Sequence, residues 1–181
     1  MNDLQPASPD LQTLVDIFYA SIEGLGTFEE IRSDAVPDVY RRLLDHNEHM
    51  TVTVEAHHQS PVEVAVLQSH STDSHYARKI LLTRQSDGKV VQFGIVRLNL
   101  DYLGPQVRQE IENQQIPLGR ILIQHNVLRK VKLLSLWKIT PGDDLQEMFG
   151  LEAAKTCYGR TALIYCNGVI AVELLEVVTP E

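Results

Sequence analysis

The sequence lacks several features that would assign the chain to a specialised class. Its longest apolar runs, such as GVIAVELLEVV, are interrupted by carboxylates, and no basic segment precedes an apolar one at Met1. Neither a membrane span nor a secretory signal is therefore expected. The two cysteines, Cys157 and Cys166, do not have CxxC spacing, which argues against a disulfide scaffold and indicates reduced core thiols. We expect a cytoplasmic protein that has no membrane partner.

Positive charge is also scarce. The chain has 16 Lys and Arg against 24 Asp and Glu, which gives a net charge of -8. Binding to nucleic acid depends on clustered Lys and Arg, so a nucleic-acid partner is not expected. If the ligand is a small anion, a few local arginines must bind it, because the overall field of the protein is negative.

Histidine is present in moderate number but without a metal-binding pattern. Seven histidines occur, and they include the close pairs His46/His49 and His57/His58. A structural zinc site needs four well-placed ligands, and the spacing supplies no consistent set. The sequence therefore predicts no metal site, and the histidines are interpreted as solvated or hydrogen-bonded side chains.

The 181 residues contain no linker-like segment, so we expect a single domain over residues 1–181. Apolar residues at helical spacing predict an N-terminal helix over 7–22, with Ser8 as N-cap and Pro9 in its first turn. Because the predicted strands follow one another without alternating crossover helices, we expect an α+β fold: a mainly antiparallel sheet of six to seven strands with helices packed on it. The other predicted helices are 37–50, 104–113, 117–124 and 141–154, and the predicted strands are 51–56, 62–68, 76–84, 89–100, 127–137, 159–166 and 169–178.

The dipeptide Asp87-Gly88 is typical of a two-residue type I′ hairpin turn. That turn would place Arg78 directly opposite Arg97, at the end of an apolar face. Like charges across a ladder repel and buried unpaired charge is costly, so an anion is expected between the two guanidinium groups. The alternative is that each arginine reaches solvent or pairs with a different carboxylate.

The dipeptide Asn167-Gly168 predicts a second hairpin of the same type. Its register would place Glu173 opposite Ala162 on an apolar face, where burial would raise the carboxyl pKa and favour acid or base chemistry. The alternative for Glu173 is a salt bridge to a neighbouring strand. Glu176 would lie on the opposite face and is expected to be solvated.

Several segments together resemble the chorismate pyruvate-lyase (4-hydroxybenzoate synthase) family, in its divergent branch outside the classical proteobacterial enzyme. They are RKILL before the first hairpin, PLGR followed by an apolar turn, and GRTALIYCNGVIAVELLEVV, and the similarity covers roughly Leu43 to Val178. The resemblance implies a monomer of chorismate-lyase-like fold with a buried pocket under helical flaps. It further implies cofactor-free elimination of pyruvate from chorismate to give 4-hydroxybenzoate, for quinone or related aromatic biosynthesis.

The resemblance also implies roles for individual residues. Arg78 would hold the ring carboxylate, and the backbone amide of Leu118 would help to bind it. Glu173 would meet the 4-hydroxyl end of the ring, so Arg78 and Glu173 are the predicted catalytic residues. Met50 would line the pocket. Arg97, placed by the hairpin register, would be the second arginine of the substrate clamp.

Two further residues of the PLGR segment are candidates for the substrate site. Gly119 would allow close approach, and Arg120 would either add positive potential or tie its helix to a sheet carboxylate. The sequence departs from the classical pattern in the length of the first hairpin and in a shorter segment between Glu173 and its turn. A rival reading is a non-catalytic domain of the same fold that senses a small aromatic acid. Such domains normally follow a DNA-binding winged helix, for which about forty residues before the first strand are too few.

Overall fold

The computed structural model describes residues 10–127 and 129–181. Their strands form one antiparallel sheet in the order β1-β5-β6-β7-β4-β3-β2, which confirms the predicted α+β class. The strands are β1 (Gly26–Ile31), β2 (Val62–Ser71), β3 (His75–Arg84), β4 (Val90–Asn99), β5 (Arg129–Pro141), β6 (Cys157–Cys166) and β7 (Val169–Val178). The helices are α1 (Leu11–Val15), α2 (Asp38–Leu44), α3 (Met50–His58), α4 (Pro105–Glu112), α5 (Leu118–Gln124) and α6 (Asp143–Phe149).

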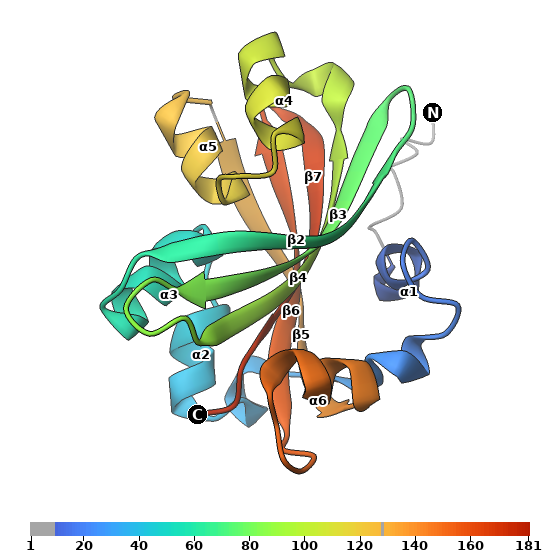
Figure 1. The fold of residues 1–181 in the computed structure, drawn as a ribbon, viewed down its shortest axis with the longest axis vertical. Helices are drawn as coiled ribbons and strands as arrows, with labels where there is room; N and C mark the ends of the chain where they lie inside the picture. Colours follow the sequence, from blue (N-terminus) through green and yellow to red (C-terminus); the bar gives the residue numbers. More distant parts are fainter. Residues whose placement is uncertain (1–9, 128) are drawn as a thin grey trace.

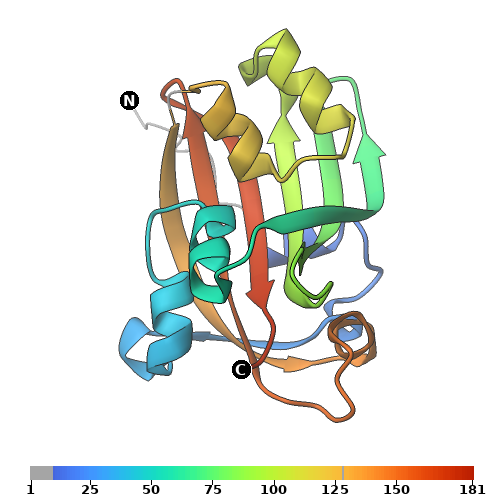
Figure 2. The same cartoon turned by 60° about the vertical axis from the view of Figure 1, so that its left-hand side comes forward.

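The helices cover both faces of the sheet. Four of them, α2 to α5, lie on one face, and α1 and α6 lie on the other (Figures 1 and 2). Alternate residues of the central strands point to each side, so Ile80 and Leu174 pack under α2 to α5 while Ile95 and Leu175 pack under α1 and α6. Among the described residues, no helix is both long and apolar enough to cross a membrane.

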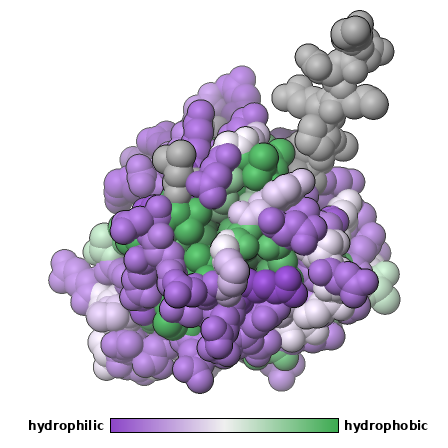
Figure 3. Space-filling model, turned by 90° about the horizontal axis from the view of Figure 1, so that it is seen from above, coloured by the Kyte–Doolittle hydropathy of each residue, from purple (hydrophilic) through white to green (hydrophobic). Residues whose placement is uncertain are grey.

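The end of the molecule seen from above shows a hydrophobic area surrounded by hydrophilic residues (Figure 3). At this end α4 and α5 lie over the sheet (Figure 1). The largest core cluster lies beneath these two helices and includes Val107, Ile111 and Leu122 with Val96 and Leu174 of the sheet. Short helices of this kind owe their stability mainly to the apolar face that they bury.

Most predicted elements are present, but the predicted strand 51–56 is wrong. These residues lie in α3, where Thr51 and Val54 are buried at helical spacing and Gln59 ends the helix in a left-handed conformation. The period-two pattern TVTV is too short to decide between strand and helix, and packing on the sheet favours the helix. Ser8 and Pro9, the predicted start of the first helix, lie outside the described residues.

Strand β1 was not predicted from the sequence. Its residues GTFEEI include two carboxylates, and most of its side chains are half-buried or exposed. It pairs with β5 from the edge of the sheet, with Gly26 opposite Pro141. An edge strand needs only one apolar side, so its sequence pattern is weak.

The first hairpin has a different register from the predicted one. The amide of Arg84 donates to the carbonyl of Lys89, and Gly88 donates to the carbonyl of Arg84, so the loop has four residues instead of two. A bulge then shifts the pairing after Leu82, and Arg78 lies opposite Val96. The prediction that Arg78 faces Arg97 is wrong by one position, and a one-position change moves a side chain to the other face.

The second hairpin has the predicted turn but not the predicted register. Asn167 and Gly168 both have positive φ, and Cys166 pairs with Val169, as expected for a type I′ turn. A bulge between Ile164 and Tyr165 then shifts the ladder by one residue. Glu173 therefore lies opposite Leu163 and not Ala162, and Glu176 occupies the face on which Glu173 was expected.

Candidate functional site

A small, partly open cavity lies between the sheet and the first residues of α3 and α5. Its volume is about 30 Å³, which is close to the space that one water molecule occupies in the liquid. Most of the lining side chains are aliphatic, and the others are charged or polar. The lining residues are His49, Met50, Thr51, Arg78, Ile80, Leu82, Gln92, Gly94, Val96, Pro117, Leu118, Gly119, Val131, Arg160, Ile164, Leu174 and Glu176.

Arg78, on the central part of the sheet, is the most unusual residue of the cavity. It is fully buried, and within residues 10–127 and 129–181 none of its three guanidinium nitrogens has a hydrogen-bond partner. Burial lowers the pKa of Arg78, and the nearby hydroxyl of Tyr76, which lies outside hydrogen-bonding geometry, acts in the opposite direction. An arginine nevertheless keeps its charge at any physiological pH. The cavity therefore contains an uncompensated positive charge with free donors, which is costly without an anion.

A second buried arginine in the cavity is fully satisfied. The Nε of Arg160 donates to Glu176 over 2.8 Å, and its terminal nitrogens donate to the carbonyl oxygens of His46 over 2.9 Å and of Glu48 over 3.0 Å. Arg160 thus ties the segment between α2 and α3 to β6 and β7. Because Glu176 neutralises Arg160, the free charge of the cavity is that of Arg78.

His49, the residue before α3, closes one side of the cavity. It is buried, and its Nε2 accepts a hydrogen bond from Arg129 over 2.7 Å. Burial, with Arg129 and Arg160 nearby, lowers the pKa of His49 to about 4, so the ring is neutral at pH 7. Beyond it lies a more open depression that shares His49 with the cavity and whose lining includes Glu48, Arg129 and Lys130. His49 therefore lies between the cavity and a depression with two positive groups and one carboxylate.

Gln92 supplies a second unpartnered group. Its side chain is buried, and no described residue donates a hydrogen bond to its Oε1. Arg78 of β3 lies opposite Val96 of β4, and Val96 is four positions from Gln92 along β4. At about 3.3 Å per residue, their backbones are roughly 13 Å apart. The cavity thus has free donors near one end and a free acceptor near the other.

Four predicted site residues line this cavity, and three do not. The lining residues are Arg78, Met50, Leu118 and Gly119. Met50 and Leu118 begin α3 and α5, where backbone amides have no partner within their own helix. Gly119 lets the helices approach, since a Cβ there would lie 3.0 Å from the Oγ1 of Thr51.

The other three residues have different surroundings. Arg97 lies opposite Glu173 on the face covered by α1 and α6, and their charged atoms are 3.4 Å apart. The predicted arginine clamp and the predicted pocket acid are therefore absent from the cavity, because the two bulges turn both side chains away. Arg120 pairs with Glu55 of α3 and donates to the carbonyl of Val62, which ties α5 to α3 and β2.

Sequence reasoning missed His49, Gln92, Arg160 and Glu176. Glu176 was expected to be solvated, yet it is buried and paired with Arg160. The only sequence signal for the pair is that the two residues lie on the strands of the Asn167-Gly168 hairpin. Finding it would require the bulge to be known in advance.

No protein-family model and no curated protein matches the chain, but solved structures share its fold. The effector domain of PhnF from Mycobacterium smegmatis is similar at TM-score 0.54 and 11% identity, over 73% of this chain and 88% of that domain. The structure of PhnF from the same organism is similar at TM-score 0.53 and 11% identity, over 72% of this chain and 63% of the PhnF chain. This chain therefore spans less than two thirds of the length of PhnF. A gene product from Staphylococcus aureus is similar at TM-score 0.50 and 10% identity, over 76% of this chain and 92% of the S. aureus chain.

The comparison corrects the predicted activity. One of these structures is described as an effector domain and none of the three as a lyase, so the prediction of a chorismate lyase in quinone biosynthesis is wrong. Neither chorismate nor 4-hydroxybenzoate is indicated by them as a partner. At identities near 11% the similarity establishes the fold alone. That fold is the chorismate-lyase-like α+β fold, which the effector domain of PhnF also has.

Proposed function

We propose that the protein is a non-catalytic binding domain for a small carboxylic acid, held in the cavity beneath α3 and α5. The observation that supports the proposal is the buried Arg78, whose guanidinium has no hydrogen-bond partner in the part of the chain that the structure describes. A carboxylate fits it well, since the planar guanidinium forms two parallel charge-assisted hydrogen bonds with one. The fold supports the same view, because the effector domain of PhnF has it.

The rest of the cavity restricts the ligand further. Its aliphatic walls, such as Ile80, Val96 and Leu174, suit an apolar body. The free Oε1 of Gln92 suits a hydrogen-bond donor at the end of the ligand away from the carboxylate. A benzoic acid with a ring hydroxyl has all three features. Glu176 is already paired with Arg160, so it is assigned a structural role.

Ligand entry requires the helices to move, because about 30 Å³ is too small for an aromatic acid. We place the entrance beside His49, which separates the cavity from the depression that contains Arg129 and Lys130. These two positive groups would attract an anion before it reaches Arg78. Outward movement of the start of α3 would then open the path.

Calorimetric titration with 4-hydroxybenzoate, benzoate and inorganic phosphate tests the proposal. The expected result is saturable binding of the two aromatic acids, weaker for benzoate because it leaves Gln92 unpaired. Arg78→Met should abolish binding. Arg97→Met is the matched control: it removes an arginine from the next strand, on the other face of the sheet, and should bind as the wild type does.

Two results would contradict the proposal. Equal affinities in wild type and Arg78→Met would place any binding elsewhere. Release of pyruvate from chorismate above the spontaneous rate would show that the domain is catalytic. The first result would refute the proposed binding site. The second would refute only the proposal that the domain is non-catalytic.

A further inference from the structure

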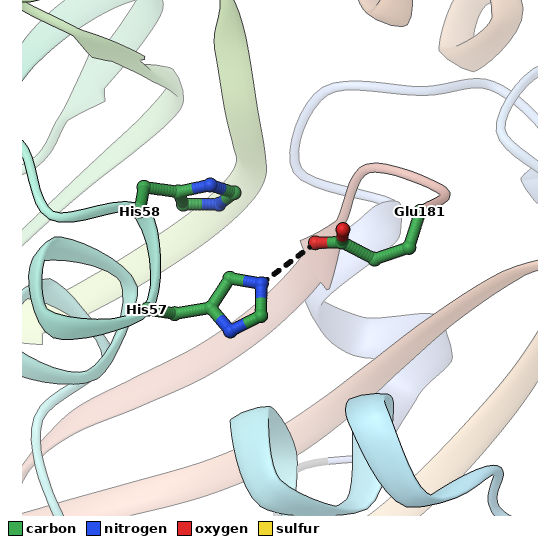
Figure 4. Close-up of side chains that lie close together, drawn as sticks. All are labelled: His57, His58 and Glu181. Atoms are coloured by element: carbon green, nitrogen blue, oxygen red, sulfur yellow. Dashed lines mark hydrogen bonds and ion pairs between the residues drawn. The ribbon is translucent and has the colours of Figure 1, made fainter.

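A cluster of potential metal ligands lies outside the cavity, at the other end of α3. His57 and His58 are the last two residues of this helix, and Glu181 follows β7. One donor atom from each of the three lies within 4.8 Å of the others. The Nε2 of His57 is 2.8 Å from the Oε1 of Glu181 (Figure 4), and the two imidazole rings are 4.7 Å apart.

The donor set fits a borderline transition metal. Two imidazoles and one carboxylate are ligands that Zn²⁺ accepts at about 2.0–2.2 Å, which places tetrahedral ligand atoms roughly 3.4 Å apart. The donor atoms lie within 4.8 Å of one another, so the widest separation must shorten by at most about 1.4 Å to reach that spacing. The side chains of His57 and Glu181 are partly exposed, at 28% and 40%, so rotation of their side-chain torsions can supply this change.

The backbone around the carboxylate is already held in place. The amide of Glu181 donates to the hydroxyl of Tyr40 over 2.8 Å, and the ammonium of Lys155 donates to its carbonyl oxygen. The hydroxyl of Tyr40 belongs to a ring packed 4.5 Å from the ring of Tyr158. The carboxylate is thus presented to α3 by the fold, and it does not meet the histidines at the end of a free tail.

Arg84 and Asp87 also lie near His58. Asp87 is not available as a fourth ligand, because both of its oxygens accept hydrogen bonds from Arg84.

We propose that His57, His58 and Glu181 form a three-ligand site for a divalent transition-metal ion such as Zn²⁺, with water at the fourth position. The ion would join the C-terminal end of α3 to the segment after β7. The same helix begins at the cavity with Met50 and Thr51. Metal binding would therefore hold in place the helix that closes the cavity. The site itself is independent of the proposed ligand.

The test is calorimetric titration of the untagged full chain with zinc chloride alone, in a buffer that does not chelate the metal. The wild type is expected to bind one equivalent. His57→Ala, His58→Ala and Glu181→Gln should each bind about tenfold more weakly or worse. The matched control is His70→Ala, which removes an exposed imidazole from β2 and leaves the cluster intact. Its affinity should equal that of the wild type.

A second readout does not depend on the variants. In NMR spectra of the wild type, zinc should shift the ring signals of two of the seven histidines and leave the others unchanged. Absence of saturable zinc binding would overturn the proposal. So would wild-type affinity in the three cluster variants, or zinc-induced shifts confined to other histidines.

Discussion

At the scale of single residues, the central feature is a charge that the protein buries and does not pair. The guanidinium of Arg78 would reduce the stability of the empty protein, because its water of hydration is lost and no hydrogen bond replaces it. Such a residue is expected where function requires it at the expense of stability. Arg160, with a carboxylate and carbonyl partners, shows how the same fold satisfies an arginine that has a structural role.

Arg78→Met is therefore expected to stabilise the empty protein while it removes ligand binding. Replacement of buried charges by apolar residues of similar size gains about 1–4 kcal/mol in the free energy of unfolding. Urea denaturation without ligand measures the difference, and Arg97→Met serves as the half-exposed control. A loss of stability in Arg78→Met would indicate that the guanidinium makes a structural contact and is not waiting for an anion.

The two neighbouring carboxylates of β7 should respond differently to neutralisation. Glu176→Gln leaves the buried Arg160 without its counter-charge, which typically costs about 3–5 kcal/mol. Glu173→Gln affects a partly exposed pair with Arg97, for which the cost is below about 1 kcal/mol. Thermal denaturation of both variants tests this order. Equal destabilisation would contradict the face assignments of the two residues.

His49 predicts a loss of stability in acid. Its pKa is lowered to about 4 in the folded protein, against about 6.5 when unfolded, so protonation favours the unfolded state. The neutral ring therefore adds to the free energy of unfolding above pH 6.5. As the pH falls from 6.5 to about 4, this contribution of about 1–3 kcal/mol is lost. Urea unfolding at pH 7 and 4.5 should show a smaller loss for His49→Gln than for the wild type and for His70→Ala. An equal loss in all three would exclude His49 as the cause.

At the scale of elements, the contact between α3 and α5 controls the closure of the cavity. Both helices begin at the cavity, and the ion pair between Arg120 and Glu55 joins them. Gly119 lies close to the start of α3, since a Cβ would meet the Oγ1 of Thr51 at 3.0 Å and the Cβ of His49 at 3.3 Å. Contacts this short require the atoms of Thr51 and His49 to move by a few tenths of an ångström.

Gly119→Ala should therefore push the start of α3 outward. The better helix propensity of alanine offers up to about 1 kcal/mol, and we expect the steric conflict to outweigh it. The expected result is a decrease in Tm of about 2–4 °C together with faster ligand association. Gly104→Ala is the control, because a Cβ there meets nothing within 4 Å. An unchanged Tm and association rate in Gly119→Ala would exclude the helix contact as the gate.

At the scale of the whole molecule, the fold class followed from the sequence but the site followed only in part. Period-two apolar patterns located six of the seven strands, and Pro117 with its apolar turn located α5. Arg78 was predicted from the hairpin register and from a family resemblance, Met50 and Leu118 from the resemblance, and Gly119 from its place in the PLGR segment; all four line the cavity. The edge strand β1 and the helix α3 were missed, because neither has a pattern strong enough to override alternatives.

The wrong positions of Arg97, Glu173 and Glu176 have a common physical origin. A turn sequence defines the pairing next to the turn, as Asn167-Gly168 does, but a bulge further along the ladder changes the face of every residue beyond it. The bulges next to Leu82 and Ile164 depend on packing across the whole sheet. They exchange Glu173 for Glu176 and remove Arg97 from the cavity. The local sequence contains no signal for these bulges that is comparable to the Asn-Gly signal for a turn.

The most direct test of the binding proposal is a crystal structure of the protein with the aromatic acid that binds most tightly in the titrations. The account predicts the carboxylate at about 2.7–2.9 Å from the guanidinium nitrogens of Arg78, the ring between the sheet and α3, and the hydroxyl on Gln92. An acid bound outside the cavity, at Arg129 or beside Arg97, with Arg78 still unpaired, would contradict it.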